Sequence, residues 1–180
     1  DVANMLTGVT PVANGGTALS SGFLNGITMA DQWRVTADFS NSSGMSVISS
    51  NWEENDTSFT RIGSVMTQSS GIFTFPSTGI YYINFNSYST YAAEANYVGI
   101  HIDGTEDNSS YSPLADAYTH FVSAADGNEL AGINCNAMFD VTNTTNCKVR
   151  FQAESSANAT FNGNTSKNRT YATFLRLGDT

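Results

Sequence analysis

Charge is scarce in this sequence of 180 residues. Charged side chains make up 13% of it, and sixteen Asp and Glu outnumber seven Lys and Arg, which gives a formal net charge of −9. A protein that binds nucleic acid presents a basic surface to the phosphates, and this composition excludes that class. The apolar runs span only a few residues, whereas a helix needs about 20 to cross a bilayer. We therefore expect no nucleic-acid partner and no insertion into a membrane.

Strong helix formers are scarce as well, with seven Leu, six Glu and two Lys, whereas Asn occurs nineteen times and aromatic residues reach 12%. Asn competes with helical hydrogen bonding, and aromatic residues favour strands. The composition predicts an all-β protein that acts outside the cytoplasm. The sequence begins at Asp1 without the pattern of a signal peptide, so we expect a processed product or a piece of a longer protein.

The first 30 residues differ from the remainder. Asn14-Gly15-Gly16 and Asn25-Gly26 are turn signals, and aromatic residues are few. Such a segment buries too little apolar surface to fold alone. We predict an N-terminal arm or collar over residues 1–30, followed by one domain over residues 31–180.

The second part alternates apolar and polar residues in short runs separated by turn signals. The clearest runs lie at 33–39, 71–75, 80–88, 96–102, 119–124, 130–141, 149–153 and 171–177. We expect eight to ten strands about ten to fifteen residues apart. This spacing predicts an antiparallel sandwich, jelly roll or barrel rather than a parallel sheet with crossover helices.

The two cysteines, Cys135 and Cys147, are too few to form a structural zinc site. They lie in the strands of a predicted hairpin, 133–140 and 146–153, where they would face each other across the ladder. Two alternatives stay open. In an oxidising medium the pair forms a disulfide, or both are buried free thiols that pack as small apolar side chains.

One acidic loop is a candidate metal site. Asp103, Glu106 and Asp107 place three carboxylates within five residues. Oxygen ligands suit Ca²⁺, although the spacing is not that of an EF-hand. The alternative is a solvated turn, which is the commoner outcome for such a cluster. No other cofactor is expected.

The inventory for catalysis is thin. His101 and His120 are the only histidines, and His101 lies on the less apolar face of its predicted strand. The motifs of serine hydrolases, zinc proteases and phosphate-binding loops do not occur. We predict that the chain is not an enzyme. A carbohydrate-active enzyme with a pair of carboxylates is the alternative.

Several aromatic residues are candidates for contact with a receptor or a glycan. They lie in or beside predicted loops that contain Ser, Asn and Asp, the composition of adaptable binding loops. The alternative is ordinary packing. The residues are Tyr88, Tyr91, Tyr97, Tyr111 and Tyr118, together with Trp52 beside the acidic stretch 53–56.

The strand pattern indicates only a fold class, whereas the segment Gly71–Phe85 indicates a family. It resembles the signature of complement C-one-q-type globular heads, which have a TNF-like jelly roll. The closing strand 171–177, with Phe174, resembles the final core strand of that family. Pro76 has no amide hydrogen for a ladder bond, so it should end a strand. The matching positions are Gly71, Phe73, Thr74, Pro76, Gly79 and Tyr81, and Ile83 occupies a place that is usually aromatic.

A second resemblance concerns the arm. Residues 8–17, Gly-Val-Thr-Pro-Val-Ala-Asn-Gly-Gly-Thr, are similar to the collar of bacteriophage tail-fibre proteins, with a departure at Ala18, where the fibres usually have Gly. The collar, residues 30–36 and a TNF-like head together resemble virion fibre proteins of marine phages.

These resemblances imply a homotrimer of jelly rolls. The function they imply is that of a non-enzymatic virion surface protein, either a fibre head or a capsid decoration. Residues 1–30 would attach it to a shaft or capsid, and outer loops would bind host-surface glycans or receptors. A secreted bacterial adhesin or an extracellular filament subunit that polymerises through the arm remains an alternative. A secreted animal signalling ligand fits the head but not the collar.

Overall fold

The computed structural model describes residues 26–91, 96–120 and 129–180. Within these ranges the chain forms fourteen strands and no helix. The strands are β1 (Met29–Val35), β2 (Phe39–Asn41), β3 (Gly44–Val47), β4 (Trp52–Glu54), β5 (Arg61–Ile62), β6 (Thr67–Ser69), β7 (Ile72–Thr74), β8 (Gly79–Tyr91), β9 (Tyr97–Thr105), β10 (Ser112–His120), β11 (Glu129–Val141), β12 (Lys148–Ser155), β13 (Ala159–Phe161) and β14 (Tyr171–Gly178). The predicted count was too low because strands of two to four residues show too little alternation to be recognised.

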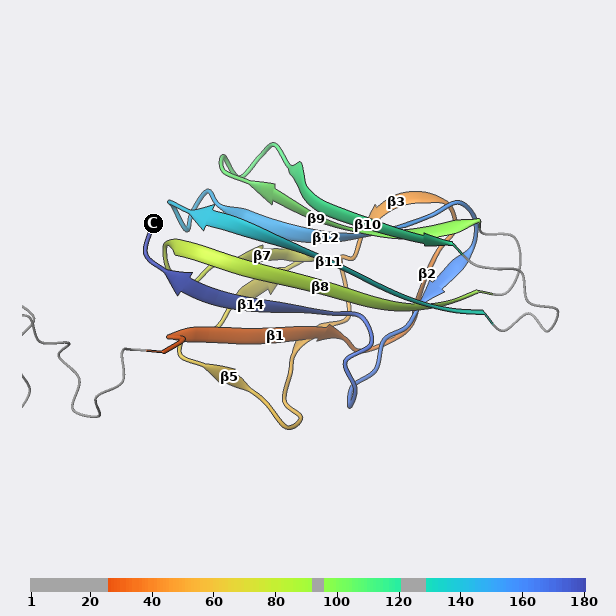
Figure 1. Cartoon of the computed structure of the whole chain (residues 1–180), viewed down its shortest axis with the longest axis horizontal. Helices are drawn as coiled ribbons and strands as arrows, with labels where there is room; N and C mark the ends of the chain where they lie inside the picture. Colours follow the sequence, from red (N-terminus) through yellow and green to blue (C-terminus); the bar gives the residue numbers. More distant parts are fainter. Residues whose placement is uncertain (1–25, 92–95, 121–128) are drawn as a thin grey trace, which may run out of the picture.

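The strands form two antiparallel sheets that pack face to face (Figure 1). The first sheet has the order β2-β13-β8-β14-β1-β4, with β11 beside β8 and β5 beside β1. The second has the order β10-β9-β12-β7-β6, with β3 beside β12. At one long edge of the sandwich β10 packs against β11. The predicted antiparallel sandwich is confirmed.

The two ends of the sandwich differ in what they contain. The start of β1 and the C-terminus lie at one end, on the left of Figure 1. The ends of β8 and β10 and the start of β9 lie at the opposite end. Since β1 already begins at Met29, the head includes the last residues assigned to the arm. Residues 1–25 lie outside the described part of the chain, so the prediction of an arm stays a prediction.

The core lies between the sheets and is rich in aromatic rings. Phe73 is fully buried and contacts Trp52 and Phe151 edge-to-face, with ring centroids 5.1 and 5.3 Å apart. Such pairs add about 0.5–1.5 kcal/mol each beyond the burial of apolar area. Phe85 and Phe174, from the first sheet, complete the same cluster.

In residues 71–85, the segment that resembles the globular-head signature, Gly71, Pro76, Gly79 and Tyr81 each have a structural role. Gly71 in the turn before β7 and Gly79 at the start of β8 both have positive φ, 78° and 141°, which L-residues with a Cβ rarely adopt. Pro76 lies between the two strands and takes no part in a ladder. Tyr81 is fully buried, and its hydroxyl donates to the carbonyl oxygen of Ser77 at 3.0 Å.

The hairpin predicted around the cysteines is wrong. The strand that contains Cys135, β11, pairs with β8 in the first sheet, whereas β12, which follows Cys147, pairs with β9, β7 and β3 in the second. The short connection between β11 and β12 therefore crosses from one sheet to the other instead of closing a ladder. Both cysteines are free and buried, and burial raises the pKa of the Cys135 thiol to about 12. Of the two alternatives, the structure has the buried thiols.

Strand β10 begins at Ser112, earlier than the run that we expected at 119–124, of which residues 121–124 lie outside the described ranges. Its Pro113 obscured the strand in the sequence. Proline is tolerated there because β10 is an edge strand that pairs only with β9 within the described ranges. The ladder shifts register between Pro113 and Ala115.

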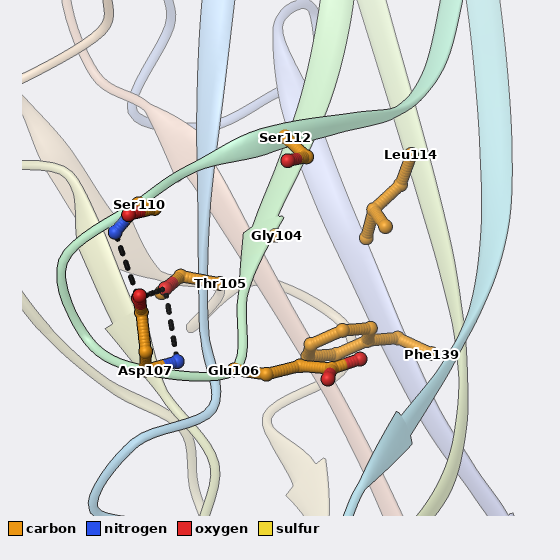
Figure 2. A pocket seen from close by; sticks show the side chains of 8 residues that line it. All are labelled: Gly104, Thr105, Glu106, Asp107, Ser110, Ser112, Leu114 and Phe139. Carbon is orange, nitrogen blue, oxygen red and sulfur yellow. Dashed lines mark hydrogen bonds between the residues drawn. The ribbon is translucent and has the colours of Figure 1, made fainter.

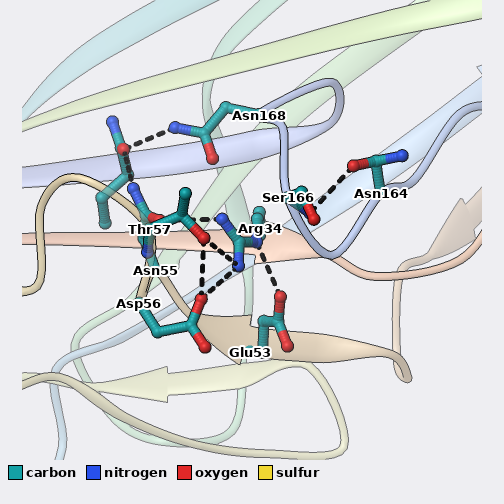
Figure 3. A network of polar contacts seen from close by, with 9 residues as sticks. Arg34, Glu53, Asn55, Asp56, Thr57, Asn164, Ser166 and Asn168 are labelled. Carbon is teal, nitrogen blue, oxygen red and sulfur yellow. Dashed lines mark hydrogen bonds and ion pairs between the residues drawn. The ribbon is translucent and has the colours of Figure 1, made fainter.

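A buried arginine organises the outer side of β1. Strict alternation would place Arg34 in solvent, yet its side chain is 1% exposed because β4 and the loop after it cover it. Its guanidinium donates to Glu53 at 2.6 Å, to Asn55 at 2.8 Å and to Asp56 at 2.5 Å (Figure 3). The network fastens the 53–57 segment to β1.

Candidate functional site

Two of the predicted tyrosines meet on the outer face of the second sheet, around Glu154. Tyr97, at the start of β9, donates its hydroxyl to Glu154 Oε1 at 3.1 Å. Tyr118, on β10, donates to Glu154 Oε2 at 2.9 Å. His101 Nε2 lies 2.9 Å from the same Oε2. Three strands, β9, β10 and β12, thus converge on one carboxylate, and we call Tyr97, His101, Tyr118 and Glu154 the tyrosine cluster.

The electrostatics of the tyrosine cluster favour a charged Glu154. Burial alone would raise the pKa of Glu154, but hydrogen bonds from Tyr118, Tyr97 and His101 outweigh burial and lower that pKa below its ordinary value. Burial, followed by the bond to Glu154, raises the pKa of Tyr118 to about 12. The bond to Glu154 also raises the pKa of Tyr97. Both phenols therefore remain protonated donors at neutral pH.

A shallow, open depression of about 410 Å³ lies over this cluster, lined by Tyr97, Tyr118, His120 and Glu154. His120 Nδ1 lies 2.9 Å from the carbonyl oxygen of Asn96. A carbonyl oxygen only accepts, so Nδ1 is the donor, and in the neutral form of the ring Nε2 is then an acceptor. The depression combines aromatic rings with hydrogen-bond acceptors.

The other predicted aromatic residues lie elsewhere. Tyr88 is in β8 of the first sheet, 5.6 Å from the Arg169 guanidinium, and Tyr91 ends the same strand. Tyr111 precedes β10, and the Arg150 guanidinium lies 4.3 Å above its ring. Tyr88 and Tyr111 do not join the tyrosine cluster, and the side chain of Tyr91 lies outside the described part of the structure. Contact of the three with a ligand stays a prediction.

The prediction for Trp52 is corrected. Its side chain is buried in the core between Phe73, Phe85 and Phe151, and its indole nitrogen donates to the carbonyl oxygen of Ile48 at 2.7 Å. The prediction relied on the acidic residues that follow Trp52. Successive residues of a strand point to opposite faces, so an outward Glu53 implies an inward Trp52. Trp52 is a core residue with no face free for a glycan.

The predicted calcium ligands do not converge on one point. Asp103 is buried on the outer face of β9, and its Oδ2 accepts from Arg150 at 3.0 Å and from Gln152 at 2.5 Å. The Arg150 guanidinium already balances that carboxylate and would repel a cation. Asp107 instead caps its own loop, as Figure 2 shows, accepting from the amide of Ser110 and the hydroxyl of Thr105.

Glu106 lines a second hollow of about 580 Å³ (Figure 2), formed by the turn between β9 and β10 and by Phe139 of β11. Its apolar wall consists of Leu114 and Phe139. Among the residues that the structure describes, no group of three or more His, Cys, Asp or Glu side chains could hold a metal ion. Asp103, Glu106 and Asp107 are thus not gathered into one ligand set in the described part of the chain, and calcium binding by them stays a prediction beside the solvated-turn alternative.

Sequence reasoning missed Glu154, which joins the tyrosines into one cluster. The alternation at 149–153 extends to position 154 and predicts an outward side chain there, so a partial signal existed. No sequence pattern places that side chain beside Tyr97 and Tyr118, because the three residues come from strands 21 to 57 positions apart along the chain. The expected outward direction of His101 agrees with the structure.

No protein-family model matches the sequence, and no curated protein matches it either. Solved structures do match. Eiger TNF from S. frugiperda is similar with a TM-score of 0.65 at 10% sequence identity, over 86% of this chain and 96% of that one. Murine APRIL, in structures at pH 8.5 and pH 8.0, is similar with TM-scores of 0.55 and 0.58 at 14% and 13% identity, over 82% and 83% of this chain and 99% and 98% of that one.

These likenesses establish the fold. The chain is an all-β antiparallel sandwich with a TNF-like jelly roll, as the resemblance of residues 71–85 predicted. At this level of identity the likeness extends to the fold alone, because one fold supports many functions. Within the described ranges, no helix has the length and apolar character needed to span a membrane.

Proposed function

We propose that this chain is a non-enzymatic, homotrimeric surface protein of a virion, either a fibre head or a capsid decoration. Residues 1–30 attach it to a shaft or capsid, and the head presents a binding surface to the host. The proposal combines the observed TNF-like fold with the phage-collar resemblance of residues 8–17. The structural observation that supports self-association most directly is the exposure of apolar side chains on the outer face of the first sheet, Met138 and Leu130 among them.

This outer face spans β14, β8 and β11. Leu175 pairs with Tyr82, and Tyr82 pairs with Met138, so the three side chains form one row across the three strands. Met138 is 57% exposed, and Leu130, nearer the other end of β11, is 64% exposed. Asn134 and Asn136 lie between these two residues on the same side of β11, so the face is mixed, with exposed apolar side chains at both ends that a contact with another copy would cover. In a closed symmetric trimer, each of the three subunits would bury its own copy of this face.

The placement of the tyrosine cluster supports outward presentation. Tyr97 begins β9 and His120 ends β10, both at the end of the sandwich opposite the start of β1 (Figure 1). A head attached through residues that precede β1 would direct the tyrosine cluster away from the particle.

The chemistry of the tyrosine cluster supports binding rather than catalysis. Glu154 is held charged by three hydrogen bonds, whereas a general acid or base needs a pKa near the working pH. Tyr97 and Tyr118 have pKa values moved further from neutrality, not toward it. The arrangement is suited to fixed hydrogen bonding.

Native mass by multi-angle light scattering tests the proposal, on the full chain and on a form that lacks residues 1–25. We expect a mass of three times 19.2 kDa for the full chain and a trimer that survives the deletion. A monomer at micromolar concentration would overturn the trimer. Immunogold labelling of intact phage particles tests the location, and unlabelled particles would overturn a virion surface role.

An edge strand of the first sheet favours the second candidate, a secreted adhesin or filament subunit, although β10 packs against that strand. Strand β11 has 13 residues and, in the described part of the chain, pairs only with β8. A long unpaired edge can accept a strand from another copy. Filaments that form from the full chain and disappear when residues 1–25 are deleted would favour this candidate over the closed trimer.

A further inference from the structure

Tyr118 is an exposed aromatic ring held in one position. It is 51% exposed, yet its hydroxyl is tied to Glu154 Oε2 at 2.9 Å. Its ring also meets Tyr97 and His101 edge-on, with centroids 5.8 and 5.5 Å away. A ring fixed in this way loses little conformational entropy when a ligand covers it.

Gly99 explains how the ring lies. Tyr118 on β10 and Glu154 on β12 are both register partners of Gly99, on opposite sides of β9. The phenol crosses the β9 backbone at Gly99 to reach Glu154. A Cβ at position 99 would lie 2.7 Å from ring atoms of Tyr118. Any larger residue would lift the ring, so glycine lets it rest against the strand with its other face toward solvent.

The polar groups around the ring are acceptors. Among the described residues, Glu154 Oε1 accepts from Tyr97 alone, at 3.1 Å, and a carboxylate oxygen can accept a second hydrogen bond. His120 offers Nε2 as an acceptor, because Nδ1 donates to Asn96. A ligand that fits must therefore donate hydrogen bonds beside an apolar face.

The charge of the site narrows the ligand further. Glu154 and the chain's net charge of −9 disfavour an anion. A ligand that brings only positive charge would compete with the three donors that already reach the Glu154 carboxylate. A neutral sugar ring has an apolar face for stacking and hydroxyl groups to donate at its rim. The depression of about 410 Å³ falls within the range of about 300–1,000 Å³ usual for small-ligand sites.

We propose that the depression over Tyr118 binds a neutral pyranose, stacked on the Tyr118 ring and donating hydroxyl hydrogen bonds to Glu154 Oε1 and His120 Nε2. The inference rests on the proposed function for the origin of the sugar, which would be a glycan of the host surface.

Saturation-transfer NMR on the full-length chain tests the site. The probes are the methyl glycosides of glucose, galactose, mannose, fucose and N-acetylglucosamine, with sialic acid and tetramethylammonium as charged comparators. We expect at least one neutral glycoside to receive saturation, with millimolar affinity, and neither comparator to do so. A signal from a charged comparator alone, or from no probe, would overturn the site.

Three variants show where the sugar binds. Tyr118→Ala removes the ring and should weaken binding by about tenfold or more. Gly99→Ala keeps Tyr118 but displaces its ring, so it should also weaken binding. Phe59→Ala removes a partly exposed ring elsewhere and should leave binding unchanged. Binding that is equal in Tyr118→Ala and in the unaltered chain would overturn the proposal.

The outcomes separate this site from the proposed function. A monomer whose glycoside signal depends on Tyr118 would support the site and overturn the trimeric head. A trimer on virions with no glycoside signal would overturn the site and leave the fibre-head proposal standing.

Discussion

Arg34 and Arg61 form ion pairs of equal length with neighbouring residues of β4, but in different surroundings. Arg34 lies 2.6 Å from Glu53, and Arg61 lies 2.6 Å from Glu54. The Arg34 side chain is 1% exposed and that of Arg61 is 45% exposed. Burial makes the first pair part of a network whose loss would leave unpaired groups, whereas water can replace the second.

Arg34→Ala should therefore lower the free energy of unfolding by about 1–3 kcal/mol, because it leaves the buried Asn55 without this partner. Arg61→Ala is the matched control and should change it by less than about 1 kcal/mol. Urea denaturation of both variants measures the difference. Equal effects would show that the Arg34 network of Figure 3 contributes no more than a surface ion pair.

Asp107 gives the acidic loop a defined pH dependence. Hydrogen bonds from the Ser110 amide, the Thr105 hydroxyl and the Ser109 amide lower the pKa of Asp107 from 3.8 to about 2. A carboxyl whose folded pKa lies below its unfolded value stabilises the fold fully above the unfolded pKa. That contribution is lost as the pH falls from about 4 through about 2.

Asp107→Asn should remove this component of the pH dependence, because asparagine keeps an acceptor oxygen but does not titrate. Urea denaturation between pH 2 and pH 5 should show a smaller loss of stability for the variant than for the unaltered chain. Since other carboxylates titrate in both proteins, the difference between the two curves is the informative quantity. Parallel curves would contradict the role assigned to Asp107.

At the scale of elements, the turn between β6 and β7 depends on one glycine. Gly71 has φ of 78°, and a Cβ there would meet the carbonyl oxygen of Ile48. Both the strain and the clash involve backbone atoms that cannot rotate away. In contrast, a Cβ added at Gly132 in β11 would meet nothing within 4 Å.

Gly71→Ala should lower the melting temperature and the free energy of unfolding, by more than about 1 kcal/mol. Gly132→Ala, as the control, should be neutral or stabilising by a few tenths of a kcal/mol, since alanine restricts the unfolded chain. Differential scanning calorimetry compares the two. A tolerated Gly71→Ala would mean that the turn relaxes to a different conformation.

At the scale of the whole molecule, the two outer faces of the sandwich have different chemistry. The face of β14, β8 and β11 exposes Met138 and Leu130, whereas the face of β10, β9 and β12 holds the polar tyrosine cluster. We expect the first face to associate with other copies and the second to stay in water. Introducing an aspartate on one face or on the other tests which of the two faces forms the contact between copies.

Met138→Asp should convert a trimer to monomers, because association would bury three carboxylates without partners. Met45→Asp places the same charge on β3 of the second sheet, where Met45 is 49% exposed, and should leave the mass unchanged. Light scattering measures both. A Met138→Asp trimer would place the subunit contact elsewhere.

Much of the fold could be predicted because it depends on local rules. The composition and period-two runs indicated strands, and Pro76 and Gly79 indicated where a strand ends and the next begins. The resemblance of residues 71–85 to a known family then predicted the jelly roll. Errors arose where a local rule was overridden. Pro113 is tolerated in β10 because an edge strand needs no second ladder.

The sequence by itself determined the strand content and which residues alternate toward a core, because these depend on composition and on neighbours two positions apart. Only the tertiary structure decided which strands pair. That choice separated Cys135 from Cys147, buried Trp52 and Arg34, and brought Tyr118 to Glu154 across Gly99. The physical reason is that sheet pairing joins strands distant in the chain, and the free energy that selects among pairings comes from burying the whole core at once.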